Sequence, residues 1–103
     1  MAHEAADFDT TLAAAAGEDQ ALLAELRAAF LESLTQQIDL LRRSRCDGNW
    51  EVAAQRLKGL GSSFHAPELV KLAQEALDSA PGEPAVIRKL ASLHERFAAR
   101  RAG

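Results

Sequence analysis

The chain has 103 residues, enough to bury one hydrophobic core and too few for two domains. Its formal net charge of -3 excludes the dense positive surface that nucleic-acid-binding proteins normally carry. The single cysteine, Cys46, cannot form an internal disulfide and has no Cys or His neighbour at metal spacing. We therefore expect no nucleic-acid partner, no metal and no other cofactor.

The beginning of the chain gives no targeting signal. Residues 1–7 contain two acidic side chains and no apolar run, so they match neither a signal peptide nor a membrane anchor. We expect these residues to be disordered. No later stretch approaches the ~20 apolar residues that a membrane span requires. These features predict a cytoplasmic protein with no membrane partner.

Composition and apolar spacing predict helices throughout the rest of the chain. Apolar residues make up 48% of it, Ala and Leu dominate, and β-branched residues are few. A short helix is predicted over 9–16, held down by Phe8 and Leu12 and ending at Gly17. A long helix is predicted over 19–45, followed by a turn at 46–49. Its apolar stripe comprises Leu22, Leu23, Leu26, Phe30, Leu34, Ile38 and Leu41.

The third predicted helix covers 50–64, and its two faces can be assigned from a rotation of about 100° per residue. The inward face is formed by Ala53, Leu57, Leu60 and Phe64. Gln55 lies almost opposite these residues, so we expect it in the middle of the face that points to solvent. Its neighbours on that side are Glu51, Lys58, Gly59 and Ser62.

Two further helices complete the predicted fold. One begins near Pro67, a residue suited to a first helical turn, and stops before Pro81. The last covers about 84–100, with an inward stripe of Val86, Leu90, Leu93 and Phe97 and with Ile87 alongside. Short connections between amphipathic helices favour antiparallel neighbours. We therefore predict a single all-α domain over 1–103, an antiparallel up-and-down four-helix bundle with an additional short N-terminal helix.

The third helix carries a pattern that resembles a known family. Residues 54–59 read Ala-Gln-Arg-Leu-Lys-Gly and are followed by Ser62, Ala66 and Leu69. This resembles the signature of histidine-phosphotransfer (HPt) domains, Ala-His-x-Leu-Lys-Gly followed by a small-residue stretch and Gly-Ala-x-x-Leu. Further matching positions are Phe8-Asp9, Glu25-Leu26, Phe30-Leu31, Gly48-Asn49-Trp50, Leu72-Ala73 and Glu75. The resemblance covers nearly the whole chain.

The resemblance implies a site on the exposed face of the third helix. In HPt domains an exposed histidine takes a phosphoryl group from an aspartate of a receiver domain and passes it to another. By this resemblance Lys58 would place a positive charge near the phosphate. Gly59 would let a partner's loops approach the helix backbone, and Ser62 would keep the surface small and polar. We also expect Glu51 and Arg56 to contact the receiver.

Two positions depart from the family pattern. Gln55 occupies the position of the phosphorylated histidine, and His65 occupies that of the later glycine. An amide nitrogen shares its lone pair with the carbonyl, so Gln55 cannot act as the nucleophile, and it lacks the charge of a phosphate. Without the motif, an exposed helical glutamine would need no function at all. His65 is expected to serve the turn before Pro67, and His94 to lie at the edge of the core.

These observations predict a phosphorelay signalling module of the two-component type. The chain would dock on response-regulator receiver domains, and also on a hybrid sensor kinase, without transferring phosphate. It would act as an adaptor or inhibitor, not as an enzyme, and as a monomer. One alternative is an active phosphotransfer protein carried as an engineered His-to-Gln variant. Another is a diverged bundle that binds an unrelated partner through an exposed apolar patch away from Gln55.

Overall fold

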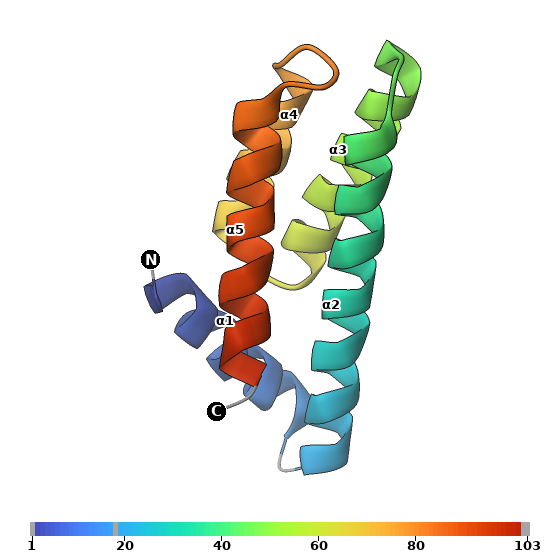
Figure 1. Ribbon diagram of the computed structural model, residues 1–103. Coiled ribbons are helices and arrows are strands. Elements are labelled where there is room, and N and C mark those ends of the chain that lie inside the picture. The colour runs from blue at the N-terminus through green and yellow to red at the C-terminus, as the bar shows by residue number, and fades with distance from the viewer. Residues whose placement is uncertain (1, 18, 102–103) are drawn as a thin grey trace.

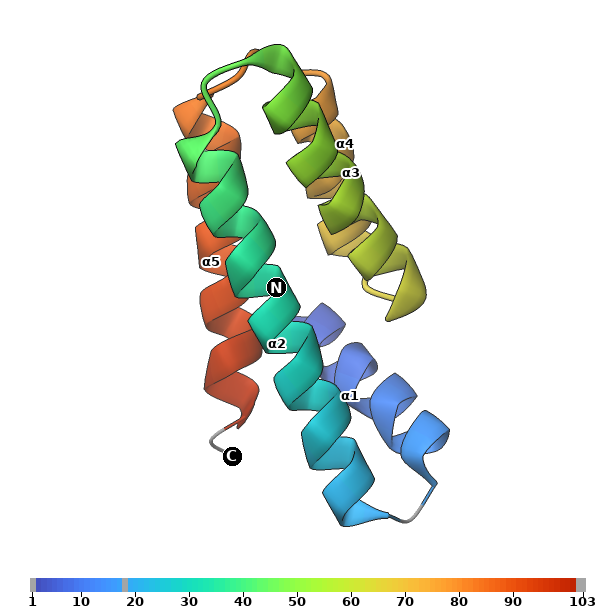
Figure 2. The same ribbon diagram turned by 90° about the vertical axis from the view of Figure 1, so that its right-hand side faces the viewer.

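The computed structural model describes residues 2–17 and 19–101, and within them the chain is all-helical, with five helices and no strand. Consecutive helices from α2 onward run in opposite directions (Figures 1 and 2). Each of these four helices packs against two of the others: α3 lies against α4 and α2, and α5 lies against α2 and α4. The helices are α1 (Ala2–Ala16), α2 (Gln20–Arg43), α3 (Asp47–Ser63), α4 (Pro67–Leu77) and α5 (Pro84–Arg101).

The first helix is longer than predicted. We placed it at 9–16 and expected disorder over 1–7, whereas α1 begins at Ala2, and Met1 lies outside the described residues. Alanine has the highest helix propensity, and three alanines in 2–7 favour this extension. Phe8 and Leu12 are buried as predicted, and α1 packs against α2 and α5 below the shorter pair α3 and α4 (Figure 2).

The long helix α2 follows the predicted stripe in its second half. Asp19 caps its start, since the carboxylate oxygen accepts a hydrogen bond from the backbone N–H of Leu22 at 3.0 Å. It ends at Arg43, two residues before the predicted end. Five residues of α2 are buried, whereas Leu23 and Leu26 are only half-buried and Leu22 is exposed. The N-terminal end of α2 extends beyond α3 and α4, so fewer neighbours cover it (Figure 2).

The third helix begins three residues earlier than predicted. We placed residues 46–49 in a turn, but Asp47, Gly48 and Asn49 form the first turn of α3, and only Cys46 remains extended. The backbone N–H of Trp50 donates to the Cys46 carbonyl at 3.1 Å, which closes that turn. An aspartate in a first turn complements the positive end of the helix dipole, which compensates for the poor helix propensity of Asp, Gly and Asn.

The turn between α3 and α4 uses His65 at a position that favours glycine. His65 has a φ of 57°, in the left-handed region. Its N–H donates to the Ser62 carbonyl, and the N–H of Ala66 donates to the Gly61 carbonyl at 2.8 Å. These two bonds form a Schellman motif at the end of α3. The predicted turn role of His65 is thereby confirmed, and α4 begins at Pro67 as predicted.

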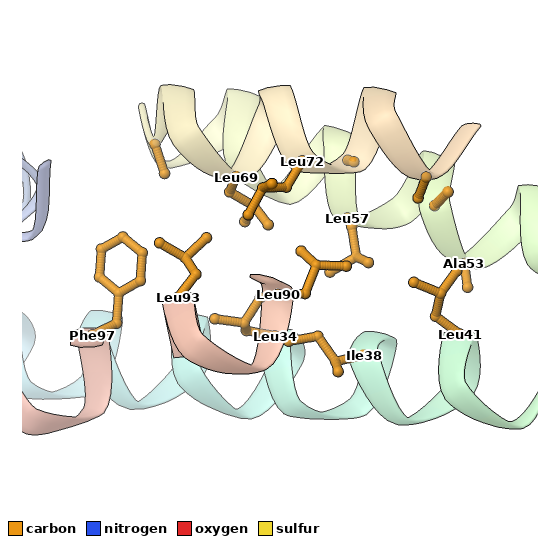
Figure 3. Packing of buried hydrophobic residues seen from close by; sticks show 14 of the residues in the cluster. Leu34, Ile38, Leu41, Ala53, Leu57, Leu69, Leu72, Leu90, Leu93 and Phe97 are labelled. Atoms are coloured by element: carbon orange, nitrogen blue, oxygen red, sulfur yellow. The ribbon is translucent and has the colours of Figure 1, made fainter. Parts of the chain in front are cut away.

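One apolar cluster contains residues of all five helices. Leucines of α2 and α5 face those of α3 and α4 across it (Figure 3). At the α1 end, Phe8, Phe30, Phe64 and Phe97 form an aromatic group with ring centroids as close as 4.4 Å. The predicted stripe of α5 is buried, with Ile87 packed against its edge. Such packing fixes the rotation of each helix about its axis, and hence which side of α3 faces water.

Polar contacts between helices fix α3 and α4 further. The indole Nε1–H of Trp50 donates to the Ala76 carbonyl at 2.7 Å in the buried interior. Arg96 of α5 donates two hydrogen bonds to the Glu68 carboxylate of α4, at 3.2 and 2.7 Å.

Among the described residues no helix has the length and apolar character needed to cross a membrane.

Candidate functional site

The predicted face of α3 points away from the core. Its opposite side is buried through Trp50, Ala53, Ala54, Leu57 and Gly61, which leaves the other half of the helix surface without a covering element. Gln55 is exposed on that half, as predicted. Of the other predicted site residues, Glu51, Arg56, Gly59 and Ser62 are exposed and Lys58 is half-buried. We call the surface formed by Glu51, Gln55, Lys58, Gly59 and Ser62 the α3 face.

The two glycines in the second half of α3 have opposite surroundings. A Cβ atom built on Gly61 would lie 2.9 Å from Val70 Cγ2 and 3.0 Å from the backbone nitrogen of the same residue. Packing of α4 therefore explains Gly61. A Cβ atom on Gly59 would meet nothing within 4 Å. Since glycine inside a helix costs roughly 1 kcal/mol relative to alanine, Gly59 lowers stability with no packing reason in the fold.

Lys58 reaches toward α4 instead of toward Gln55. Its Nζ donates to Oε1 of Gln74 at 2.8 Å, and Nε2 of Gln74 donates to the Asp78 carboxylate at 3.2 Å. The ion pairs found among the described residues do not include Lys58. Helical rotation predicts Lys58 on the same side as Gln55 but gives no indication of Gln74, because that contact depends on how α4 packs on α3.

The α3 face offers hydrogen-bonding groups and positive charge but no histidine. Gln55 supplies an amide that both donates and accepts, and Ser62 supplies a hydroxyl. Lys58 on the α4 side and Arg56 on the α2 side flank these two uncharged residues, and Glu51 is the one acid of the face. In the part of the chain that the structure describes, no group of three or more His, Cys, Asp or Glu is placed to hold a metal. The arrangement is suited to docking an anionic surface.

A groove between α2 and α3 borders the face and was not predicted. It is lined at one end by Leu40 and Val52, whose exposed fractions are 38% and 49%, and by Arg56. Farther along the same two helices, Arg56 and Gly59 line a second hollow with Gln37, whose buried Oε1 has no hydrogen-bond partner. Val52 could have been found from the helical rotation, since it lies about 60° from Gln55. Nothing in the sequence indicated Gln37.

His94 lies at the edge of the core, as predicted. It is half-buried, and its Nε2 is 2.8 Å from the hydroxyl oxygen of Thr35 on α2. That hydroxyl donates its proton to the Leu31 carbonyl at 2.9 Å, so the histidine donates and the threonine accepts. The contact joins α5 to α2 on a side of the molecule away from Gln55.

Comparisons of the chain with protein-family models, with curated proteins and with solved structures give no match. The resemblance to HPt domains therefore depends on the sequence pattern of the chain itself.

Proposed function

We propose that the chain is an HPt-like signalling module that docks on response-regulator receiver domains and transfers no phosphate. In this proposal α2 to α5 form an antiparallel four-helix bundle, α1 is an additional helix at one end, and the α3 face is the docking surface. The partner is a receiver domain, free-standing or within a hybrid sensor kinase. The module acts as an adaptor or inhibitor in the cytoplasm.

Gly59 is the observation that carries this proposal. It lies in the middle of a helix, where it lowers stability, and its Cβ position is open to solvent. A bare helix surface of this kind lets the backbone of a partner approach closely. Gln55 and Ser62 lie on the same face and add two uncharged polar side chains to it.

The chemistry of position 55 supports docking without transfer. Phosphoryl transfer to a side chain needs a nucleophile, and the amide of Gln55 is not one. Its length and hydrogen-bonding groups are close to those of an unphosphorylated histidine, so a receiver could still be accommodated. A docked receiver would have its phosphorylated aspartate covered and its other partners excluded.

The exposed apolar residues favour this proposal over an unrelated helical partner. Large exposed hydrophobic side chains among the described residues are Leu22, Leu40 and Val52. Leu40 and Val52 line the groove beside the α3 face, and Leu22 stands apart from them near the start of α2. The apolar surface thus adjoins the proposed docking site, whereas the alternative requires a large patch away from Gln55.

A phosphate-transfer assay tests the proposal. Receiver domains from the organism that encodes the chain are phosphorylated on aspartate and mixed with the purified protein. We expect capture of at least one receiver, a changed rate of loss of its phosphate, and no phosphate on this chain. Neither capture nor a changed rate with any receiver would contradict the proposal.

Two variants separate docking from transfer. Gln55→His should keep capture and acquire acid-labile phosphate, because the imidazole restores a nucleophile at the same place. Lys58→Glu should weaken capture at least about fivefold, since it reverses a charge that lies beside the docked anion. Equal capture by the two variants and the unaltered chain would show that the α3 face is not the docking surface. Sequencing the natural gene at codon 55 tests the engineered-variant alternative.

A further inference from the structure

Lys58 is the only cation within the α3 face, and a neutral side chain holds it. The ammonium group donates to Oε1 of Gln74 at 2.8 Å, and the lysine side chain is half-buried between α3 and α4. An amide oxygen satisfies the hydrogen bond without cancelling the charge. A glutamate at position 74 would instead form an ion pair.

The orientation of the Gln74 amide is set from its other side. Nε2 of Gln74 donates to the Asp78 carboxylate at 3.2 Å. A reversed amide would direct an N–H group toward the ammonium and the carbonyl oxygen toward the carboxylate, so both contacts would be repulsive. Gln74 thus bonds to both Lys58 and Asp78, and the ion pairs found among the described residues do not join these two groups. The lysine is held in place without a carboxylate partner, so it loses little conformational freedom when a partner binds.

The one acid of the α3 face, Glu51, forms no ion pair with Lys58. Glu51 precedes Lys58 by about 10 Å along the helix axis. Gln55 is neutral, and Arg56 adds a second cation on the α2 side. A partner that brings extra negative charge to this face should therefore bind more tightly than the same partner without it.

We propose that Gln74 is a positioning residue that holds Lys58 uncompensated, and that the α3 face therefore prefers phosphorylated receivers over unphosphorylated ones. The inference rests on the proposed function, because it takes a receiver as the partner. It specifies in addition which phosphorylation state of the receiver the protein recognises. The protein would sequester the activated form and leave the resting form free.

The test compares one receiver in two states. A receiver captured in the transfer assay is titrated with the protein in Mg²⁺ alone and in Mg²⁺ with beryllofluoride, which mimics the phosphoryl group on aspartate. We expect at least about fivefold tighter binding of the beryllofluoride form, the effect of one added charge near 4 Å at a hydrated surface. Lys58→Gln should abolish this preference.

Gln74→Glu tests the positioning role and should also abolish the preference, because the new carboxylate pairs with Lys58. Arg88→Gln is the matched control. It makes the same change in net charge at an exposed position on α5 and should keep the preference. Thermal unfolding of each variant separates a lost preference from a lost fold.

Three results would overturn the inference, and they are distinguishable. Equal binding of the two receiver states by the unaltered chain removes the preference, while the proposed function stands. A preference that survives Gln74→Glu but not Lys58→Gln removes the role of Gln74. If no receiver is captured in either state, the proposed function fails and this inference fails with it.

Discussion

Gly61 and Gly59 stand two residues apart in α3 and face opposite surroundings. Gly61 is buried where the backbone of α4 comes within contact distance, so any side chain there would displace a neighbour. Gly59 lies in open space, where an added Cβ atom would meet nothing within 4 Å. Packing thus explains the glycine on the buried side of α3 but not the glycine on its exposed side. This difference is the basis for the proposal that Gly59 serves a partner and not the fold.

The largest expected effect on stability separates the buried side of α3 from its exposed side. Leu57→Ala should lower the free energy of unfolding by about 2–5 kcal/mol, because Leu57 is fully buried and its loss leaves a cavity. Gln55→Ala should change it by less than about 0.5 kcal/mol, as is usual at exposed sites. Urea unfolding of both variants measures the difference. A large cost at Gln55 would mean that its side chain supports the fold.

Gly61→Ala should destabilise the fold by about 1–3 kcal/mol. The added methyl would meet Val70 Cγ2 at 2.9 Å and two backbone atoms, Val70 N at 3.0 Å and Ala66 O at 3.2 Å, so α4 must shift. Chemical unfolding measures the cost. Gly61→Ala combined with Val70→Ala should recover part of it, because the side-chain part of the clash is then removed. If the double variant recovers no stability, the clash involves backbone atoms alone.

Gly59→Ala should have the opposite sign and raise the free energy of unfolding by about 0.5–1 kcal/mol. The methyl meets nothing within 4 Å, and alanine has the higher helix propensity. The same unfolding experiment measures it beside Gly61→Ala. A loss of stability at Gly59 would show a packing role and would remove the main support for a docking surface.

The smallest expected effect on stability is at His65, in the turn after α3. His65→Gly should stabilise the fold by about 0.5 kcal/mol, because glycine adopts the positive φ without the steric cost of a Cβ atom, partly offset by its greater freedom when unfolded. Calorimetric melting measures this as a small rise in Tm. His65→Val should lower Tm, since β-branched residues are rarely found at positive φ. A stabilising valine would contradict the role assigned to this position.

The sequence predicted those parts of the fold in which periodic apolar residues decide the structure. The stripes of α2 and α5 identified both helices and most of their buried residues, and the rotation of α3 placed Gln55 outward and Leu57 inward. The start of α3 was missed because Asp, Gly and Asn favour turns, yet they also suit a first helical turn when an aspartate meets the helix dipole. Local preference alone does not separate the two outcomes.

The candidate site was predicted as a set of positions but not as a set of contacts. Helical rotation determines that Lys58 and Gly59 lie near Gln55. It does not determine that Lys58 bonds to Gln74 or that Val52 lies across a groove from Leu40, because both contacts depend on how separate helices pack. The same limit applies to Gln37, whose buried oxygen lies in a hollow that α2 and α3 line together.

The most direct test of the proposed docking surface places bulk at Gly59. Gly59→Gln should leave the fold intact, since the site is open, while blocking close approach of a receiver and lowering its affinity at least about tenfold, equivalent to about 1.4 kcal/mol. Ser92→Gln adds a similar side chain at an exposed position on α5 and should leave the affinity unchanged. Equal affinities of the two variants for the receiver would contradict the assignment of the α3 face as the docking surface.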